Sequence, residues 1–425
     1  METPLNKDRI EAAYSAAKER YAEFGVDTDK AIKALSGVSL SLHCWQGDDV
    51  GGFEKPAASL SGGGIQVTGN YLGKARTVAE LRSDLEKAYS LIPGKHRVNL
   101  HAIYGEFGGK LVDRDEIAPE HFQGWVDWAK ANGVGMDFNA TLFSHPKADD
   151  GFTLSHEDKS IRAFWIEHTR RAREISAFMG RETGTPVVHN LWIPDGCKET
   201  PADRRAPRQR LKNSLDLIYA DKYSPDYLRD AVECKLFGIG SESYVVGSHE
   251  FYMGYAMKNG LMVCMDLGHF HPTESIADKI SSVLMFSDEV LLHVSRGVRW
   301  DSDHVVIAND DLMDVTREVV RNGLDKVHVA LDYFDGTLNR VGAWVTGSRA
   351  TLKGILAGLL EPSAMLKEYE DSGKLFERLA LTEEAKAMPM GDVWNYYCLQ
   401  AGVPVGADWI GELQAYEAAV TSKRV

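Results

Sequence analysis

The feature that most constrains the fold of this chain is a series of eight short apolar runs separated by helical stretches. The runs lie at residues 38–43, 97–101, 134–139, 187–192, 231–235, 261–266, 290–295 and 327–332. Each has the length of a strand rather than of a helix. The stretches between them, such as 80–92, 120–132 and 160–180, have helical patterns. Alternating strands and helices indicate parallel strands joined by crossover helices.

Eight such units over roughly 300 residues fit a (β/α)8 barrel, which typically takes about 250 residues before insertions. We therefore predict an α/β protein with a (β/α)8 TIM barrel as its catalytic domain at 36–345. Residues 1–35 are expected to form an N-terminal helical segment, and 346–425 a C-terminal helical extension with oligomer contacts. A doubly wound open sheet is the alternative.

Charge and cysteine usage exclude several kinds of protein. The 48 basic and 62 acidic residues give a net charge of −14, which argues against nucleic acid or an anionic membrane as partner. The five cysteines are scattered and lack CxxC spacing, which favours a reduced compartment. The first residues have a charged helical pattern, so we expect no signal peptide, and no apolar run approaches the ~18–20 residues of a membrane span. We expect a soluble, cytoplasmic protein.

Nearly every apolar run ends in a polar residue. These residues are His43, His101, Asn139, Asn190, Glu233, Lys235, Asp266, His293 and Asp332. In a (β/α)8 barrel the carboxyl ends of the strands converge on one face, where catalytic groups sit. One polar strand end usually just meets solvent, but eight of them indicate a polar site on that face.

A first predicted metal site takes three carboxylates and one imidazole from four consecutive strands. Its members are Glu233, Asp266, His293 and Asp332. This donor set suits a divalent cation such as Mg²⁺, Mn²⁺ or Zn²⁺. Without a cation, the clustered carboxylates would repel one another and have raised pKa values.

A second predicted metal site lies beside the first. His269 follows Asp266 by three residues, and Asp301 and Asp303 stand two residues apart in the loop after the next strand. Residues at i and i+2 of an extended loop point the same way, so both carboxylates can bind one ion. With Asp266 shared, the two sites would lie close together, as in two-metal enzymes. Taken singly, such residues are more often turn residues, caps or satisfied polar groups.

Further residues suggest a substrate pocket around these sites. Lys235 shares the strand face of Glu233, so it can donate to a substrate oxygen or form a salt bridge to the same carboxylates. Aromatic faces of the kind that a sugar ring needs would come from Trp45, Tyr104, Phe143, Trp192 and Phe334. The long Gly-rich segment 46–75 is expected to be a lid.

Two motifs favour other functions only weakly. Residues 69–74 resemble a phosphate-binding loop but have three residues between the glycines instead of four. The HxH of His269 and His271 would suit an amidohydrolase metal site, but it follows the sixth strand instead of the first.

Long motifs run through residues 40–345. They are HCWQGDDV (43–50), NLHAIY (99–104), FSHP (143–146), DGFTLSH (150–156), NLWIPDG (190–196), ESYVVGSHEFYMGYA (242–256), DLGHFHPTE (266–274), LLHVSRGVRWDSDHVV (291–306) and LDYFD (331–335). In these motifs the chain resembles the L-rhamnose isomerase family. The resemblance implies a barrel akin to xylose isomerase, a homotetramer, and Mn²⁺-dependent interconversion of L-rhamnose and L-rhamnulose in L-rhamnose catabolism in the cytoplasm.

The resemblance also implies roles for single residues. A catalytic metal would be held by His269, Asp301 and Asp303, and a structural one by Glu233, Asp266, His293 and Asp332. Zn²⁺, Co²⁺ or Mg²⁺ could replace Mn²⁺. Lys235 matches the lysine of the family's E-x-K motif, and His101 and Trp192 match positions near the sugar. Leu267 departs from the Ala expected there but leaves the ligands in place.

The implied reaction moves a hydrogen between C2 and C1 of the sugar and a proton between their oxygens. A cation bound to both oxygens polarises the carbonyl, which favours a direct hydride shift, and Asp332 or Lys235 would assist the proton. An enediol route with a carboxylate base stays open.

Two other functions also stay open: a metal-dependent hydrolase or endonuclease with the same ligands, and a non-catalytic sugar-binding protein that needs only the aromatics.

Overall fold

Eight parallel strands close into a barrel in the computed structural model, which describes residues 7–54, 67–235, 243–298 and 303–424. The strands are β1 (Ser39–His43), β2 (Lys95–His101), β3 (Gly135–Asn139), β4 (Val187–Trp192), β6 (Leu228–Glu233), β8 (Met262–Asp266), β9 (Val290–Val294) and β10 (Val327–Leu331). Each pairs with the next in this order, and β10 pairs back with β1. The predicted (β/α)8 barrel is confirmed, and the open sheet is wrong.

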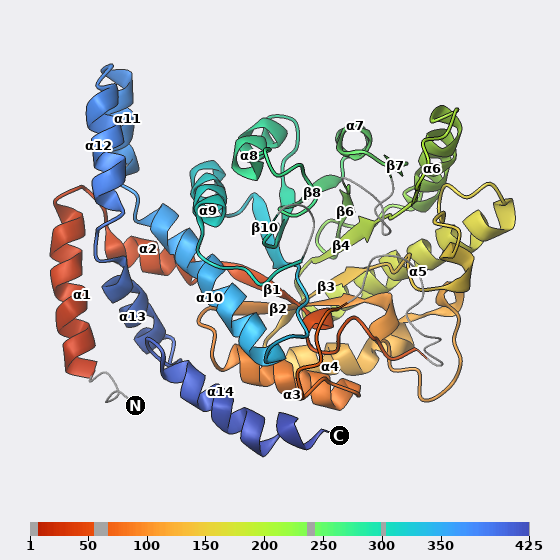
Figure 1. The fold of residues 1–425 in the computed structure, drawn as a ribbon, viewed down its shortest axis with the longest axis horizontal. Coiled ribbons are helices and arrows are strands. Elements are labelled where there is room, and N and C mark those ends of the chain that lie inside the picture. The colour runs from red at the N-terminus through yellow and green to blue at the C-terminus, as the bar shows by residue number, and fades with distance from the viewer. Residues whose placement is uncertain (1–6, 55–66, 236–242, 299–302, 425) are drawn as a thin grey trace.

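A helix follows each barrel strand and covers the outside of the barrel (Figure 1). In chain order these helices are α3 (Val78–Tyr89), α4 (Gln123–Asn132), α5 (Lys159–Thr183), α6 (Arg205–Ile218), α7 (His249–Asn259), α8 (Ile276–Leu284), α9 (Asp310–Asn322) and α10 (Arg340–Leu359). The longest, α5, begins after Asp158, whose carboxylate accepts a hydrogen bond from Ser160 N, and ends at Gly184 in the left-handed conformation. A short antiparallel pair, β5 (Gly196–Cys197) and β7 (Tyr244–Val245), lies outside the barrel.

The fifth barrel strand begins earlier than its sequence predicts. We expected it at 231–235, whereas β6 covers Leu228–Glu233. Its first half contains Asp230, which is half-buried and forms an ion pair with Arg173 at 2.9 Å. Lys235 therefore lies two residues beyond the strand instead of at its end.

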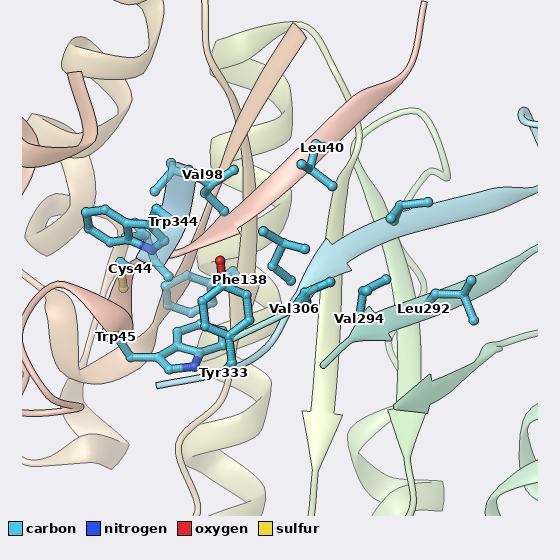
Figure 2. Packing of buried hydrophobic residues seen from close by; sticks show 14 of the residues in the cluster. Leu40, Cys44, Trp45, Val98, Phe138, Leu292, Val294, Val306, Tyr333 and Trp344 are labelled. Carbon is cyan, nitrogen blue, oxygen red and sulfur yellow. The ribbon is translucent and has the colours of Figure 1, made fainter. Parts of the chain in front are cut away.

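The core lies between the strands and the helix layer and contains large aromatic side chains. Trp125, Trp165 and Trp344 are fully buried. Figure 2 shows Trp344 of α10 packed beside the end of β1, and its indole N–H donates to the carbonyl oxygen of His43 at 2.8 Å. The last barrel helix thereby fixes the carboxyl end of the first strand, at the face where the site lies.

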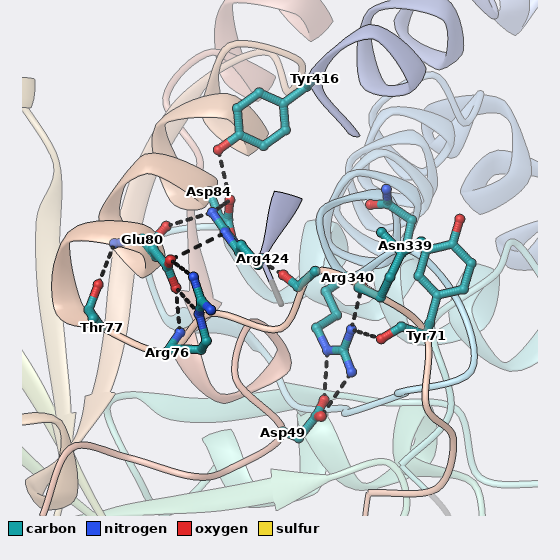
Figure 3. A network of polar contacts seen from close by, with 12 residues as sticks. Asp49, Tyr71, Arg76, Thr77, Glu80, Asp84, Asn339, Arg340, Tyr416 and Arg424 are labelled. Atoms are coloured by element: carbon teal, nitrogen blue, oxygen red, sulfur yellow. Dashed lines mark hydrogen bonds and ion pairs between the residues drawn. The ribbon is translucent and has the colours of Figure 1, made fainter. Parts of the chain in front are cut away.

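The remaining helices come from the two ends of the chain and lie along one side of the barrel (Figure 1). They are α1 (Lys7–Ala22), α2 (Thr28–Leu35), α11 (Ser363–Asp371), α12 (Leu375–Ala385), α13 (Met390–Gln400) and α14 (Asp408–Ala419). Tyr14 of α1 stacks on Tyr396 of α13 with ring centroids 3.9 Å apart. Near the C-terminus, Arg424 donates to both carboxylate oxygens of Asp84 in α3 at 2.6 and 2.7 Å (Figure 3). None of the helices in the described part of the chain has the length and apolarity that a membrane crossing requires.

The segment after β1, which we expected to form a lid at 46–75, is described only in part, because 55–66 lie outside the described residues. Arg340 of α10 holds both flanks of this segment (Figure 3). It donates to both oxygens of Asp49 at 2.7 and 2.8 Å and to the carbonyl oxygen of Tyr71 at 2.7 Å. Asp49 has a φ of +57°, which is uncommon for a residue other than glycine, and the ion pair helps to hold it there.

Candidate metal centre and active site

The four residues of the first predicted metal site lie at the carboxyl ends of neighbouring strands. Glu233 ends β6, Asp266 ends β8, His293 stands opposite Asp266 in β9, and Asp332 directly follows β10. Parallel pairing of β6, β8, β9 and β10 gathers these four side chains at the same end of the barrel. Glu233, Asp266 and His293 are at most 2% exposed.

Their ligand atoms converge on one point. One ligand atom from each of the four residues lies within 4.8 Å of the other three. Nδ1 of His293 is 3.3 Å from Asp332 Oδ2, 3.5 Å from Glu233 Oε2 and 3.8 Å from Asp266 Oδ2. This geometry confirms the predicted convergence of the four side chains.

Several of these buried atoms have no hydrogen-bond partner among the described residues. They are Glu233 Oε1, Asp266 Oδ2 and both ring nitrogens of His293. Leaving buried polar atoms unsatisfied costs free energy, so native structures rarely contain them without an ion or water. Three carboxylates and one imidazole, several of whose buried atoms lack a hydrogen bond in the described part of the chain, therefore fit a divalent cation.

The pKa shifts show how the cluster competes for protons when no cation is bound. Burial lowers the pKa of His293, but the surrounding acidic groups outweigh it and raise that pKa well above its usual value. Burial raises the pKa of Glu233, yet the facing His293 and His269 bring it below its usual value. Burial, with the nearby carboxylates, raises the pKa of Asp266 to about 7. A cation must therefore displace protons from this cluster in order to bind.

The second predicted metal site is described in part. His269 is buried in the turn after β8, and its Nδ1 lies 3.0 Å from Glu233 Oε1. Asp303 lines the same cavity as His269, whereas Asp301 lies outside the described residues. Asp266 shapes the turn, because its Oδ1 accepts from the backbone N–H of Gly268 at 2.6 Å. The structure thus brings His269 and Asp303 to one cavity beside the first cluster.

The cluster opens into a cavity at the carboxyl end of the barrel. Its lining combines predicted ligands with an aromatic wall: Trp45, Val50, His101, Asn139, Phe143, Asn190, Trp192, Glu233, Lys235, His269, His293, Asp303, Asp332 and Phe334. Four of the five aromatic residues expected at the wall are present. A cavity that offers flat apolar faces beside charged groups suits a small polyhydroxylated molecule.

Three residues expected near a sugar lie in this cavity. Nζ of Lys235 lies 4.9 Å from the centroid of the Trp192 ring, within range of a cation–π interaction. His101 meets Trp45 and Phe143 edge to face, and its Nδ1 lies 3.1 Å from Thr141 Oγ1. Burial lowers the pKa of His101 to about 3, so its ring is neutral at physiological pH.

One predicted wall residue is wrong, and the weakly favoured HxH metal site does not form. Tyr104 does not belong to the wall: it is fully buried in a short 3₁₀ turn, and its hydroxyl donates to Asp48 at 2.6 Å. His271 is exposed, and its Nδ1 contacts Thr273 Oγ1 at 2.8 Å, so the HxH does not form a two-histidine metal site.

Residues that position the ligands were not recognised as such from the sequence. Asn190 Nδ2 donates to Glu233 Oε2, Trp45 Nε1 donates to Asp332 Oδ1 at 2.9 Å, and Ser295 Oγ donates to Asp266 Oδ1 at 2.9 Å. Each hydrogen bond engages one oxygen of a carboxylate and fixes the orientation of that carboxylate. Ser295 stands two residues after His293, and residues at i and i+2 of a strand face the same side. This spacing could have predicted that Ser295 points toward the cluster.

The closed parallel barrel and the buried acid–imidazole cluster, with its adjoining cavity, define a (β/α)8-barrel protein with a candidate divalent-cation centre. A family model described as L-rhamnose isomerase (RhaA) matches residues 8–424. An L-rhamnose isomerase of Rhodopirellula baltica is 58% identical over 98% of this chain and 97% of its own length. The relative of the same name from Bacteroides thetaiotaomicron is 55% identical, over 98% of this chain and 99% of its own.

The chain belongs to the L-rhamnose isomerase family, and it is therefore an isomerase. Among solved structures it is similar, with 11% identity and a TM-score of 0.49, to an L-ribulose 3-epimerase over 75% of this chain and 95% of that one. The barrel assignment rests on the strand pairing described above.

Proposed function

We propose that this protein interconverts L-rhamnose and L-rhamnulose in L-rhamnose catabolism, as a Mn²⁺-dependent aldose–ketose isomerase. Its similarity to named relatives over nearly the whole chain supports this proposal. The observation that carries it is structural: three members of the cation cluster, Glu233, His293 and Asp332, face the same cavity as Lys235 and the aromatic wall. A sugar in that cavity would meet a cation on one side and ring faces on the other.

Two cations would occupy the site. Glu233, Asp266, His293 and Asp332 would hold a structural ion, and His269, Asp303 and Asp301 would hold the catalytic one. When bound, the cation supplies Lewis-acid polarisation of the sugar carbonyl. Carboxylate and imidazole donors suit Mn²⁺, and they also accept Zn²⁺, Co²⁺ or Mg²⁺.

The protein's own side chains would orient the sugar and move one proton. Trp192 would provide a face for the sugar and hold Lys235 beside it. Lys235 or Asp332 would assist transfer of the proton from the C2 oxygen to the C1 oxygen. The neutral ring of His101 would exchange hydrogen bonds with a sugar hydroxyl.

The carbon-bound hydrogen would move from C2 to C1 together with its bonding electrons. The C2–H bond breaks as the C1–H bond forms, and the C2 hydroxyl becomes the new carbonyl. This route is favoured because the buried carboxylates are committed to cations, and a cation-bound carboxylate is a weak base. Abstraction of a proton from C2 would need a free carboxylate at that carbon.

We further propose a homotetramer in the cytoplasm, with the division into 1–35, 36–345 and 346–425 given above. Self-association is supported by Leu375, Phe376 and Leu379 of α12, which are 58%, 78% and 60% exposed. All five cysteines are free, as in proteins of a reducing compartment. Sedimentation velocity of the purified protein tests the assembly, and a monomer at micromolar concentration would contradict it.

An assay for ketose with chelator-treated protein tests the activity. Without metal we expect no ketose from L-rhamnose, and with Mn²⁺ we expect full activity together with a higher melting temperature, because ions that bind only the folded chain stabilise it. The ligand variant Asp266→Asn should lose both the activity and the metal-dependent rise in melting temperature. Folded, Mn²⁺-loaded protein that forms no ketose would contradict the proposal, and ketose formation in demonstrably metal-free protein would remove the metal from it.

A further inference from the structure

One cysteine shares ligands with the acid–imidazole cluster. Cys264 lies in β8 two residues before Asp266, so both side chains point into the barrel interior. In the strand pairing, Cys264 stands opposite Glu233 of β6. Its Sγ, a carboxylate oxygen of Glu233 and a ring nitrogen of His293 all lie within 4.8 Å of one another.

All three of these residues are buried, whereas Asp332 of the four-residue cluster is half-buried. Cys264 is fully buried, and Glu233 and His293 are each 2% exposed. Cys264 also belongs to a small buried apolar cluster inside the barrel that includes Ala231, Leu291 and Ala330. The thiol thus stands at the boundary between apolar packing and the acid cluster.

Glu233 and His293 each have buried polar atoms without a hydrogen bond to another described residue, and Oε1 of Glu233 faces Nδ1 of His269 at 3.0 Å. Oε1 of Glu233 and both ring nitrogens of His293 have no hydrogen-bond partner within the described residues. With ordinary Zn–S, Zn–N and Zn–O bond lengths, donors of a tetrahedral site lie about 3.3–3.6 Å apart. Donors within 4.8 Å of one another can reach that geometry by side-chain shifts of about 1 Å.

We propose that Glu233, Cys264 and His293 form a second, softer ligand set within this centre, which binds a thiophilic divalent cation such as Zn²⁺ or Cd²⁺. Thiolate and imidazole ligands favour such cations, whereas the four-residue set of carboxylates and imidazole suits Mn²⁺. On binding, the S–H bond of Cys264 breaks, the proton leaves to solvent and a sulfur–metal bond forms. No oxidation or reduction occurs.

The two ligand sets exclude each other because they share Glu233 and His293. A thiophilic cation would therefore displace the hard cation from the shared residues instead of adding to it. This competition rests on the proposed Mn²⁺ centre, whereas binding of the soft cation by Cys264 stands without it.

Titration of metal-free protein with Cd²⁺ tests the proposal by ultraviolet absorption, where a thiolate-to-metal charge-transfer band reports sulfur coordination. We expect the band at one equivalent in wild-type protein and in Cys398→Ser, which alters a buried cysteine that contacts Arg349 far from the cluster. Cys264→Ser should lack the band and bind Cd²⁺ about 10- to 100-fold more weakly, while its Mn²⁺ affinity changes by less than about threefold.

Two further variants keep the test decisive. Cys264→Ala replaces Cys264→Ser if the serine variant does not fold. Asp266→Asn, which damages only the hard set, should keep the Cd²⁺ band while it loses Mn²⁺ binding. A band that persists without Cys264, or wild-type protein that binds Cd²⁺ at one equivalent with no band, would overturn the proposal. Because the readout is absorption, failure here is distinguishable from failure of the isomerase assay.

Discussion

Oε1 of Glu233 lies 3.0 Å from Nδ1 of His269, while Oε2 of the same carboxylate lies 3.5 Å from Nδ1 of His293. One buried carboxylate thus faces both of the ligand groups that the sequence assigned to separate ions. The two groups form one continuous centre, and a change in either is expected to affect the other through Glu233.

Replacement of His269 distinguishes the catalytic ligand group, to which His269 belongs, from the four-residue structural cluster. We expect His269→Ala to lower turnover about 100- to 1,000-fold, because several kcal/mol of Lewis-acid stabilisation are lost, while the four-residue cluster still binds one ion. Steady-state kinetics and elemental analysis measure the two effects. The matched control is His328→Ala, another histidine paired with a glutamate, Glu289, at 2.8 Å but at the opposite end of the barrel. Normal turnover with normal metal content in His269→Ala would make the catalytic assignment wrong.

Metal affinity should depend on pH through Asp266, whose pKa burial raises to about 7. Because its pKa is raised in the folded chain, the protonated carboxyl of Asp266 contributes to the stability of the metal-free fold at low pH. This stability is lost as the pH rises from about 4 through 7. The cation needs the ionised form, so Mn²⁺ should bind more tightly, and raise the melting temperature more, at pH 8 than at pH 5.5. Calorimetry in buffers of different ionisation enthalpy should also detect proton release. An equal Mn²⁺ affinity at both pH values would contradict this sign.

Lys235 should act on the sugar and not on the fold. We expect Lys235→Met to reduce turnover about 100-fold or more, as removal of a proton-transfer group does, with metal content and melting temperature little changed. Lys279→Met is a matched control, because Lys279 also lies 4.9 Å from the centre of an aromatic ring, that of Phe270, outside the cavity lining. If both variants keep wild-type turnover, Lys235 contacts Trp192 but takes no part in proton transfer.

The barrel and the cation cluster could be predicted because each depends on a local pattern. Every strand is a short apolar run, and Glu233, Asp266 and His293 stand at or near the ends of three successive runs. Once the strands are consecutive and parallel, their carboxyl ends meet, and no further information is needed to bring these side chains together.

The contacts that orient the ligands depend on strand register and loop geometry, which no local pattern encodes. Asn190 reaches Glu233 across the β4–β6 pairing, and Trp45 reaches Asp332 from the 3₁₀ turn after β1. Tyr104 was misplaced for a related reason, since the turn Ala102–Tyr104 directs it into the core. The start of β6 was missed because a long-range ion pair satisfies its polar residues.

The fate of the hydrogen on C2 tests the central claim most directly. L-Rhamnose deuterated at C2 is incubated with the Mn²⁺-loaded protein in ordinary water, and the ketose is analysed by mass spectrometry. Since the buried carboxylates of the site are committed to cations, we predict that the deuterium appears at C1 of L-rhamnulose with little loss to solvent. Ketose that has lost most of its label would contradict the hydride shift and require one of those carboxylates to act as the base, and the absence of any ketose would contradict the proposed isomerisation itself.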